Sequence, residues 1–177
     1  MAELLVVVGN PKPASRTRLA AERVAERLAA GVPELDPPRT LELAELAGEL
    51  FDWGAERAGA EAAAAQQAGL LVVATPTFKA SYTGLLKAFL DRIPAGGLDL
   101  VTAVPVMLGG AADHRLAVET HLRPLLVELG AACPTAGLFL LDDALGELDS
   151  VLEPWLAVAR PRVAALVAAQ QKIRAGS

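Results

Sequence analysis

The segment GNPKPASRTR, residues 9–18, carries residues that could hold an anionic group. It separates a short apolar run from a stretch of helical periodicity. Ser15 or Thr17 could cap this helix, so its free first-turn N–H groups would point at a phosphate, with Arg16 or Arg18 adding attraction. An ordinary surface loop with a cap and solvated arginines would use the same residues. The fold decides which interpretation applies.

Two common phosphate-binding motifs are absent from the sequence. There is no G-x-x-x-x-G-K-[ST] motif, which argues against a nucleoside-triphosphate hydrolase. There is also no G-x-G-x-x-G motif after the first apolar run, which argues against a dinucleotide-binding Rossmann domain. A mononucleotide held by its single phosphate remains as the ligand class.

A second segment, ATPTFKASYTG at residues 74–84, could hold a flat ligand. Pro76 forces an extended turn, and Thr77 and Phe78 offer backbone groups and an aromatic face. Alternatively, Phe78 and Tyr82 are loop aromatics that pack on the helix that follows. Both segments come directly after an apolar run, which is where ligands bind in sheets of parallel strands.

Short apolar runs alternate with longer segments of helical period, the pattern of parallel strands joined by crossover helices. We therefore predict one doubly wound α/β domain, with a five-stranded parallel sheet and helices on both faces. The expected strands are residues 4–8, 40–43, 70–74, 101–108 and 137–141. The expected helices are residues 17–28, 55–68, 82–92, 113–129 and about 150–174, with Pro154 and Pro161 marking starts or kinks in the last.

Composition narrows the function classes. A chain of 177 residues with 53% hydrophobic residues predicts a single domain over residues 1–177. The net charge of −5 argues against nucleic acid or an anionic membrane as the main partner. The start MAELLVVVG lacks a basic region, and its apolar run is shorter than the roughly 20 residues of a membrane helix. Cys133 is the one cysteine, so no intramolecular disulfide or thiolate metal cluster is expected, and we predict a cytoplasmic protein.

Three segments in this order resemble a known family: GNPKPASRTR, TPTFKASYTGLLKAFLD and PVMLGGAADHRLAVETHLRPLLVELGA. They are similar to the NAD(P)H-dependent FMN reductases of the flavodoxin-like superfamily. The resemblance is greatest to the branch that feeds two-component alkanesulfonate monooxygenases. It spans residues 4 to about 143, and it implies a flavodoxin-like sheet.

The resemblance implies a set of FMN-binding residues and no catalytic side chain or metal. The FMN phosphate would be held by Asn10, Ser15, Arg16 and Thr17. The isoalloxazine and ribityl groups would be lined by Pro76, Thr77, Phe78, Lys79 and Ser81. Gly109 and Gly110 would place backbone N–H groups at the pyrimidine edge, where reduced flavin accumulates negative charge, although a simple turn would also explain them. Phe78 replaces the Tyr of many relatives, so one hydroxyl contact is missing.

The expected helix at residues 113–129 contains Pro124, which removes a backbone hydrogen bond and predicts a kink or a π-bulge. Relatives that supply flavin carry an inserted aromatic or histidine in this helix, and His121 occupies that place. The resemblance implies that the insertion lies at a subunit interface and permits FMN exchange. His121 could equally be a packed helix residue. We assign it no proton-transfer role.

The carboxylates Asp142 and Asp143 follow the last expected strand and could suggest a metal or an acid/base pair. A helix cap or a solvated loop explains them better.

The expected function is NAD(P)H:FMN oxidoreductase, with FMN as a loosely held substrate and a flavin-dependent monooxygenase as the partner that receives reduced FMN. One alternative keeps FMN bound and reduces quinones or azo dyes. A second alternative is a flavodoxin-like electron carrier, although the basic residues of the first segment argue against it. A homodimer or homotetramer is expected. The sequence does not decide whether NADH or NADPH is the preferred hydride donor.

Overall fold

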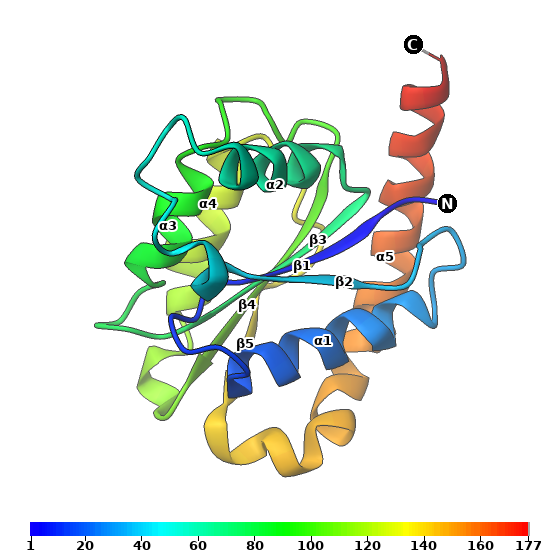
Figure 1. Ribbon diagram of the computed structural model, residues 1–177. Helices are drawn as coiled ribbons and strands as arrows, with labels where there is room; N and C mark the ends of the chain where they lie inside the picture. The colour runs from blue at the N-terminus through cyan, green and yellow to red at the C-terminus, as the bar shows by residue number, and fades with distance from the viewer. Residues whose placement is uncertain (177) are drawn as a thin grey trace.

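Five parallel strands form one sheet in the order β2-β1-β3-β4-β5 (Figure 1). This computed structural model describes residues 1–176. The strands are β1 (Leu4–Val8), β2 (Arg39–Glu42), β3 (Leu70–Pro76), β4 (Thr102–Gly109) and β5 (Leu138–Leu141). The order is that of flavodoxin-like proteins, with the winding direction reversing between β1 and β3. The predicted fold class is confirmed.

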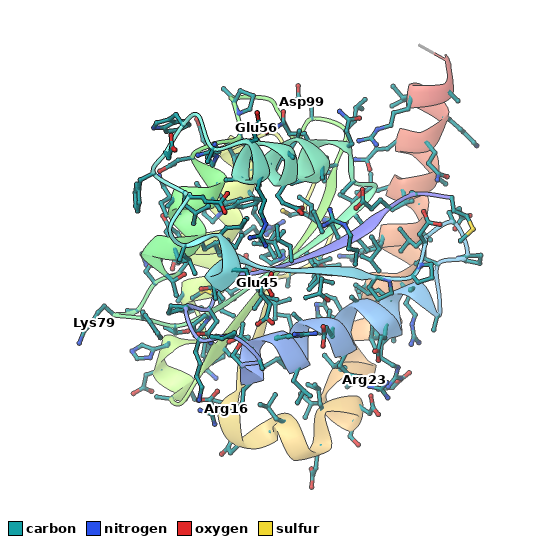
Figure 2. The ribbon with its side chains drawn as sticks, in the orientation of Figure 1. Arg16, Arg23, Glu45, Glu56, Lys79 and Asp99 are labelled. Atoms are coloured by element: carbon teal, nitrogen blue, oxygen red, sulfur yellow. The ribbon has the colours of Figure 1, made fainter. Side chains whose placement is uncertain are left out.

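Helices cover both faces of the sheet. On one face lie α1 (Arg16–Ala29) and α5 (Leu148–Gly176), and on the other lie α2 (Glu56–Gln67), α3 (Gly84–Leu90) and α4 (Arg123–Glu128) (Figure 1). Side chains fill the space on both sides of the sheet (Figure 2). All five residues of β1 are buried because each face of that strand meets a helical layer. Continuous apolar runs were therefore a sound basis for predicting the strands.

The register brings the ends of the central strands to one edge. Val8 pairs with Ala74 between β1 and β3, and Thr75 pairs with Met107 between β3 and β4. Gly109, the last residue of β4, pairs with Leu141 of β5. The loops that follow these strands therefore meet at the carboxyl edge of the sheet, as expected for parallel strands.

The segment expected as one helix over residues 113–129 is broken into three parts. They are a 3₁₀ turn, η2 (Ala112–His114), a π-helix, η3 (Val118–Leu122), and α4. Pro124 cannot donate a backbone hydrogen bond, and the π-helix directly precedes the turn that contains it. Of the two predicted distortions, the structure has the π-helix.

The last helix, α5, is longer than expected and begins at Leu148. Pro154 and Pro161 both lie inside it, so neither marks its start. A 3₁₀ turn, η4 (Asp142–Glu147), joins β5 to α5. Within residues 1–176, α5 and the other helices are all too short or too polar to span a membrane.

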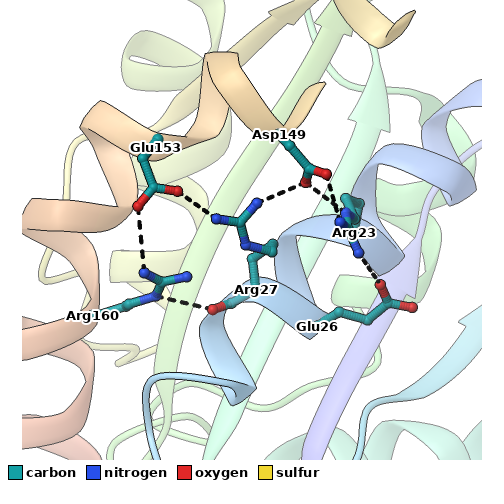
Figure 3. A network of polar contacts seen from close by, with 6 residues as sticks. All are labelled: Arg23, Glu26, Arg27, Asp149, Glu153 and Arg160. Atoms are coloured by element: carbon teal, nitrogen blue, oxygen red, sulfur yellow. Dashed lines mark hydrogen bonds and ion pairs between the residues drawn. The ribbon is translucent and has the colours of Figure 1, made fainter. Parts of the chain in front are cut away.

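Charged side chains join α1 to the start of α5 (Figure 3). Arg23 binds both oxygens of Asp149, with Nε–Oδ1 at 2.7 Å and Nη2–Oδ2 at 2.6 Å. Arg27 donates to Asp149 Oδ1 at 2.7 Å and also contacts Glu153. These hydrogen bonds, first that from Arg23 and then that from Arg27, lower the pKa of Asp149 to about 2.

We expect Asp149→Asn to lower the urea midpoint of unfolding slightly at pH 7, since exposed ion pairs contribute little. A carboxylate with a lowered pKa stabilises the folded state above its unfolded pKa and loses this contribution as pH falls through its folded pKa. The difference in urea midpoint between the variant and the wild type should therefore become smaller as the pH falls from 3.8 to about 2. Urea unfolding over a pH series measures it.

The matched control is Glu147→Gln, because Glu147 is exposed and has no ion pair among the described residues. This variant should follow the wild type at every pH. If the midpoint of Asp149→Asn differs from that of the wild type by the same amount at every pH, the charge of Asp149 does not cause the difference.

Candidate functional site

A cleft of about 440 Å³ lies at the carboxyl edge of the sheet, which is within the size range of small-molecule sites. It is formed by the loops after β1 and β3, the end of β4 and the start of η4. The lining residues are Asn10, Pro11, Lys12, Ala14, Ser15, Arg16, Thr17, Pro76, Thr77, Phe78, Leu108, Gly109, Gly110 and Asp142. Of the residues expected at the site, only Lys79 and Ser81 do not line the cleft.

The N-terminus of α1 faces this cleft. Ser15 is its N-cap, and Ser15 Oγ accepts a hydrogen bond from the Arg18 N–H at 3.3 Å. The N–H groups of Arg16 and Thr17 have no partner among the described residues, as is usual for a helical first turn. Asn10 Nδ2 donates to Thr17 Oγ1 at 3.0 Å, which ties the end of β1 to the helix. The arrangement is that of an anion site.

The two arginines of the first turn have separate roles. Arg18 binds Glu22 at 2.9 Å and Glu42 at 2.6 Å, and these carboxylates raise its pKa. Its charge is therefore compensated outside the cleft. Arg16 lines the cleft, where its Nη2 lies 3.2 Å from Asp142 Oδ2. Of the two, Arg16 is the cation available to a ligand.

Two threonine hydroxyls hold the loop after β3. Thr75 Oγ1 accepts from the Thr83 N–H at 3.2 Å and donates to the Pro76 carbonyl at 3.0 Å. Thr83 caps α3 by accepting from the Leu86 N–H, and its hydroxyl donates to the Gly9 carbonyl at 2.5 Å. The loops after β1 and β3 are therefore joined directly, beneath the cleft.

A tight turn directs Lys79 away from the cleft. Phe78 and Ser81 exchange backbone hydrogen bonds of 2.8 and 3.1 Å across this turn. Lys79 and Ala80 at its centre have φ of 51° and 63°, as a type I′ turn requires. Figure 2 shows Lys79 projecting from the molecule. Without Gly or Asn at its centre, this turn had no sequence signal.

The two loop aromatics behave differently. Phe78 is 50% exposed and lines the cleft, whereas Tyr82 packs partly buried against the core on the α3 side. The ligand interpretation therefore fits the position of Phe78, and the packing interpretation fits Tyr82.

One side-chain oxygen in the cleft wall is buried without a partner. Thr77 Oγ1 makes no hydrogen bond within residues 1–176. Its backbone N–H, by contrast, donates to the Leu108 carbonyl at 2.7 Å, which fixes the residue against β4. Buried hydroxyls are normally paired, so this one marks a place where a ligand can supply the missing hydrogen bond.

Gly109 fills a position with no room for a side chain. A Cβ there would lie 2.7 Å from Phe139 Cζ and 3.3 Å from Thr77 Oγ1. The neighbouring Gly110 N–H has no partner among the described residues and adds a donor to this end of the cleft. These features fit the expected backbone contact to a flat ligand.

Two charged residues that line the cleft, Lys12 and Asp142, were not among the expected site residues. Asp142 is the acidic one. It lies in the first turn of η4 and makes no capping hydrogen bond, so the cap interpretation is wrong for it. Asp143 is exposed, which fits a solvated residue. The sequence did offer one signal for Asp142, which is that it directly follows the last strand. That strand, β5, pairs with β4, and Gly109 lies opposite Leu141, so the two strands end side by side.

Other chemically active residues lie elsewhere. His114 and His121 are exposed and do not line the cleft, so His121 is not a packed helix residue. Burial raises the pKa of the Cys133 thiol to about 11, which keeps it protonated. Residues 1–176 contain no group of three His, Cys, Asp or Glu able to hold a metal.

A hollow of about 490 Å³ is lined by residues of α1, η4 and the start of α5, and by no strand residue. Its charged lining includes Arg23, Glu26 and Asp149, which already pair with one another. We therefore take the cleft at the strand ends as the functional site.

Comparison with known proteins identifies a common family. The family described as NADPH-dependent FMN reductase matches residues 2–146. An NADH-dependent FMN reductase, SfnF, of Pseudomonas putida is 32% identical over 157 residues, which cover 85% of this chain and 83% of that protein. An FMN reductase (NADPH) of Escherichia coli is 43% identical over 77 residues, and the match covers 44% of this chain but only 40% of that protein.

A solved structure extends the likeness to the whole fold. The crystal structure of an oxidoreductase from Corynebacterium diphtheriae superposes with a TM-score of 0.84 at 30% identity. The superposition covers 95% of this chain and 97% of that one.

We expect Thr77→Val to stabilise the ligand-free protein and to weaken FMN binding. The unpaired hydroxyl costs about 1 kcal/mol or more, and its removal should raise Tm by roughly 2–4 °C per kcal/mol. FMN would lose the hydrogen bond that this hydroxyl can make. Thermal unfolding and flavin fluorescence titration measure the two effects.

Thr135→Val is the matched control, because Thr135 Oγ1 is also buried without a partner but does not line the cleft. It should give a similar gain in Tm with unchanged FMN affinity. A lower Tm for Thr77→Val, or equal FMN affinities, would contradict the role given to Thr77.

Gly109→Ala should destabilise the protein by about 1–3 kcal/mol, because the added methyl group must displace Phe139 or Thr77. The displaced side chain should also weaken FMN binding. The control is Gly59→Ala in α2, where the nearest atom to a Cβ, Arg92 Nη2, is 3.9 Å away. That change should gain up to about 1 kcal/mol from helix propensity. Equal stability of the two variants, measured by urea unfolding, would refute the packing argument.

Proposed function

The chain belongs to the NADPH-dependent FMN reductase family, and we propose that it is an NAD(P)H:FMN oxidoreductase that supplies reduced FMN to a flavin-dependent monooxygenase. In this proposal FMN is a loosely held substrate. The observation that carries it is the cleft where the α1 N-terminus, the unpaired Thr77 hydroxyl and Gly109 come together.

The residues of the cleft fit FMN at both ends. The phosphate would lie against the N–H groups of Arg16 and Thr17, with Ser15 and Asn10 holding this turn in place. Pro76, Thr77 and Phe78 would line the ring and ribityl side, and Gly109 and Gly110 the pyrimidine edge. For Lys79 and Ser81, which lie outside the cleft, the structure offers no such support.

FMN, when bound, supplies the ring that accepts a hydride from the nicotinamide. The protein's part is to position the two rings and to place donors where negative charge develops. Backbone N–H groups near Gly110 and the Thr77 hydroxyl suit that task. In this proposal the reaction needs no acid, base or nucleophile from the protein.

Two features support loose binding. The cleft offers a phosphate two cations, Lys12 and Arg16, because Arg18 is bound by Glu22 and Glu42. Loss of the Arg18 charge to these carboxylates weakens the attraction for the phosphate. Phe78 offers a face but no hydroxyl, and half of it is exposed. A flavin held in this way could leave for a second enzyme.

We extend the proposal to a homodimer or homotetramer in the cytoplasm. Leu116 and Val127, which lie on either side of the π-helix, are 66% and 53% exposed, and His121 within it is exposed as well. Covering this segment by another subunit would bury its apolar side chains. His121 would then lie at the interface, where it could influence FMN exchange.

The test is oxidation of NADPH and of NADH in air by flavin-free protein, with FMN added from none to excess. Turnover should depend on FMN and saturate with it, and the faster nucleotide identifies the preferred hydride donor. A protein that holds FMN through dilution and turns over only with a quinone would instead be a flavin-bound quinone reductase. A protein that binds FMN but oxidises neither nucleotide would be an electron carrier.

A further inference from the structure

A carboxylate pairs with the arginine that the proposed function assigns to the phosphate. Lys12, Arg16 and Asp142 are the charged residues that line this cleft. Asp142 Oδ2 is 3.2 Å from Arg16 Nη2, and it would be 3.8 Å from a Cβ at Gly110. The negative charge therefore lies near both the Arg16 guanidinium and Gly110, which follows β4.

We propose that Asp142 sets the affinity of the cleft for phosphorylated flavin by competing with the phosphate for Arg16. This inference rests on the proposed function, since it concerns the same site. It makes Asp142 a determinant of how tightly FMN is held relative to a flavin without a phosphate.

The charges give the direction of the effect. A phosphate monoester carries about −1.5 to −2 charges at pH 7, and the guanidinium of Arg16 carries one positive charge. When FMN enters, its phosphate must share or displace the Asp142 carboxylate, and the two anions repel each other. Riboflavin has no phosphate, so its binding avoids this repulsion.

The geometry favours competition over a positioning role for Asp142. The ion pair between Arg16 and Asp142 is a single contact, and the Arg16 side chain is 66% exposed. By contrast, Arg23 is held by both oxygens of Asp149, and Arg18 by two carboxylates. One contact leaves the guanidinium plane free to rotate, so Asp142 does not fix Arg16 for the phosphate.

The experiment compares FMN and riboflavin binding to flavin-free wild type, Asp142→Asn and Asp143→Asn by isothermal titration calorimetry. For Asp142→Asn at low salt, the Kd of FMN should fall on the order of tenfold. The Kd of riboflavin should change less than about twofold, because this ligand carries no charge near residue 142. Added salt should shrink the FMN effect, since it screens the repulsion.

Asp143→Asn is the matched control, because it removes the same charge from the neighbouring exposed residue, which does not line the cleft. Its FMN and riboflavin affinities should equal those of the wild type. Weaker FMN binding by Asp142→Asn would show that Asp142 positions Arg16, and equal changes for both flavins would show an effect on cleft shape. Either result overturns the inference.

Failure of the proposed function has a different signature. FMN binding with no nucleotide oxidation rejects the reductase proposal, while the affinity ratio of FMN to riboflavin still decides the role of Asp142. Wild type that binds neither flavin rejects both.

Discussion

Parallel pairing of β1 with β3 and of β3 with β4 brings three strand ends to one edge of the sheet, and the cleft depends on this register. Val8, Pro76 and Gly109 end their strands within a few residues of one another in the ladder. These three strands are buried on both faces, so within them polar groups can reach solvent only where a strand ends. The cleft therefore forms at the strand ends, where the N–H groups of Arg16, Thr17 and Gly110 have no partner among the described residues.

Hydrogen bonds from threonine hydroxyl groups hold the loops at these strand ends in place. Thr75 Oγ1 accepts a hydrogen bond from the Thr83 N–H, and the Thr83 hydroxyl donates to the Gly9 carbonyl, so Thr83 joins the loop after β3 to the loop after β1. Thr83 is also the N-cap of α3. The same side chain therefore caps this helix and binds Gly9, directly after the neighbouring strand β1. The Thr77 hydroxyl, close to these contacts in the chain, has no partner among the described residues, and this contrast is why we propose Thr77 as the threonine that contacts the ligand.

The sequence predicts the architecture well because its signals are local. Unbroken Val and Leu runs define strands, and Ser15 before a periodic segment defines the start of α1. What it could not predict depends on contacts distant along the chain. Arg16 and Arg18 look alike in sequence, but Arg18 meets Glu42 and Arg16 meets Asp142, which lies more than a hundred residues away. The family resemblance placed Lys79 at the site, and nothing in the neighbouring residues signals the turn with φ above zero that directs it away.

A cleft built on backbone donors has an evolutionary consequence. The N–H groups of Arg16, Thr17 and Gly110 are present whatever side chains those residues carry, so the donors survive substitution as long as the backbone path is kept. Substitution is then most restricted at positions that hold this path, such as Gly109, where a side chain has no room. Related proteins that keep these backbone donors can change the charge around a ligand, one side chain at a time, without rebuilding the site that holds the ligand.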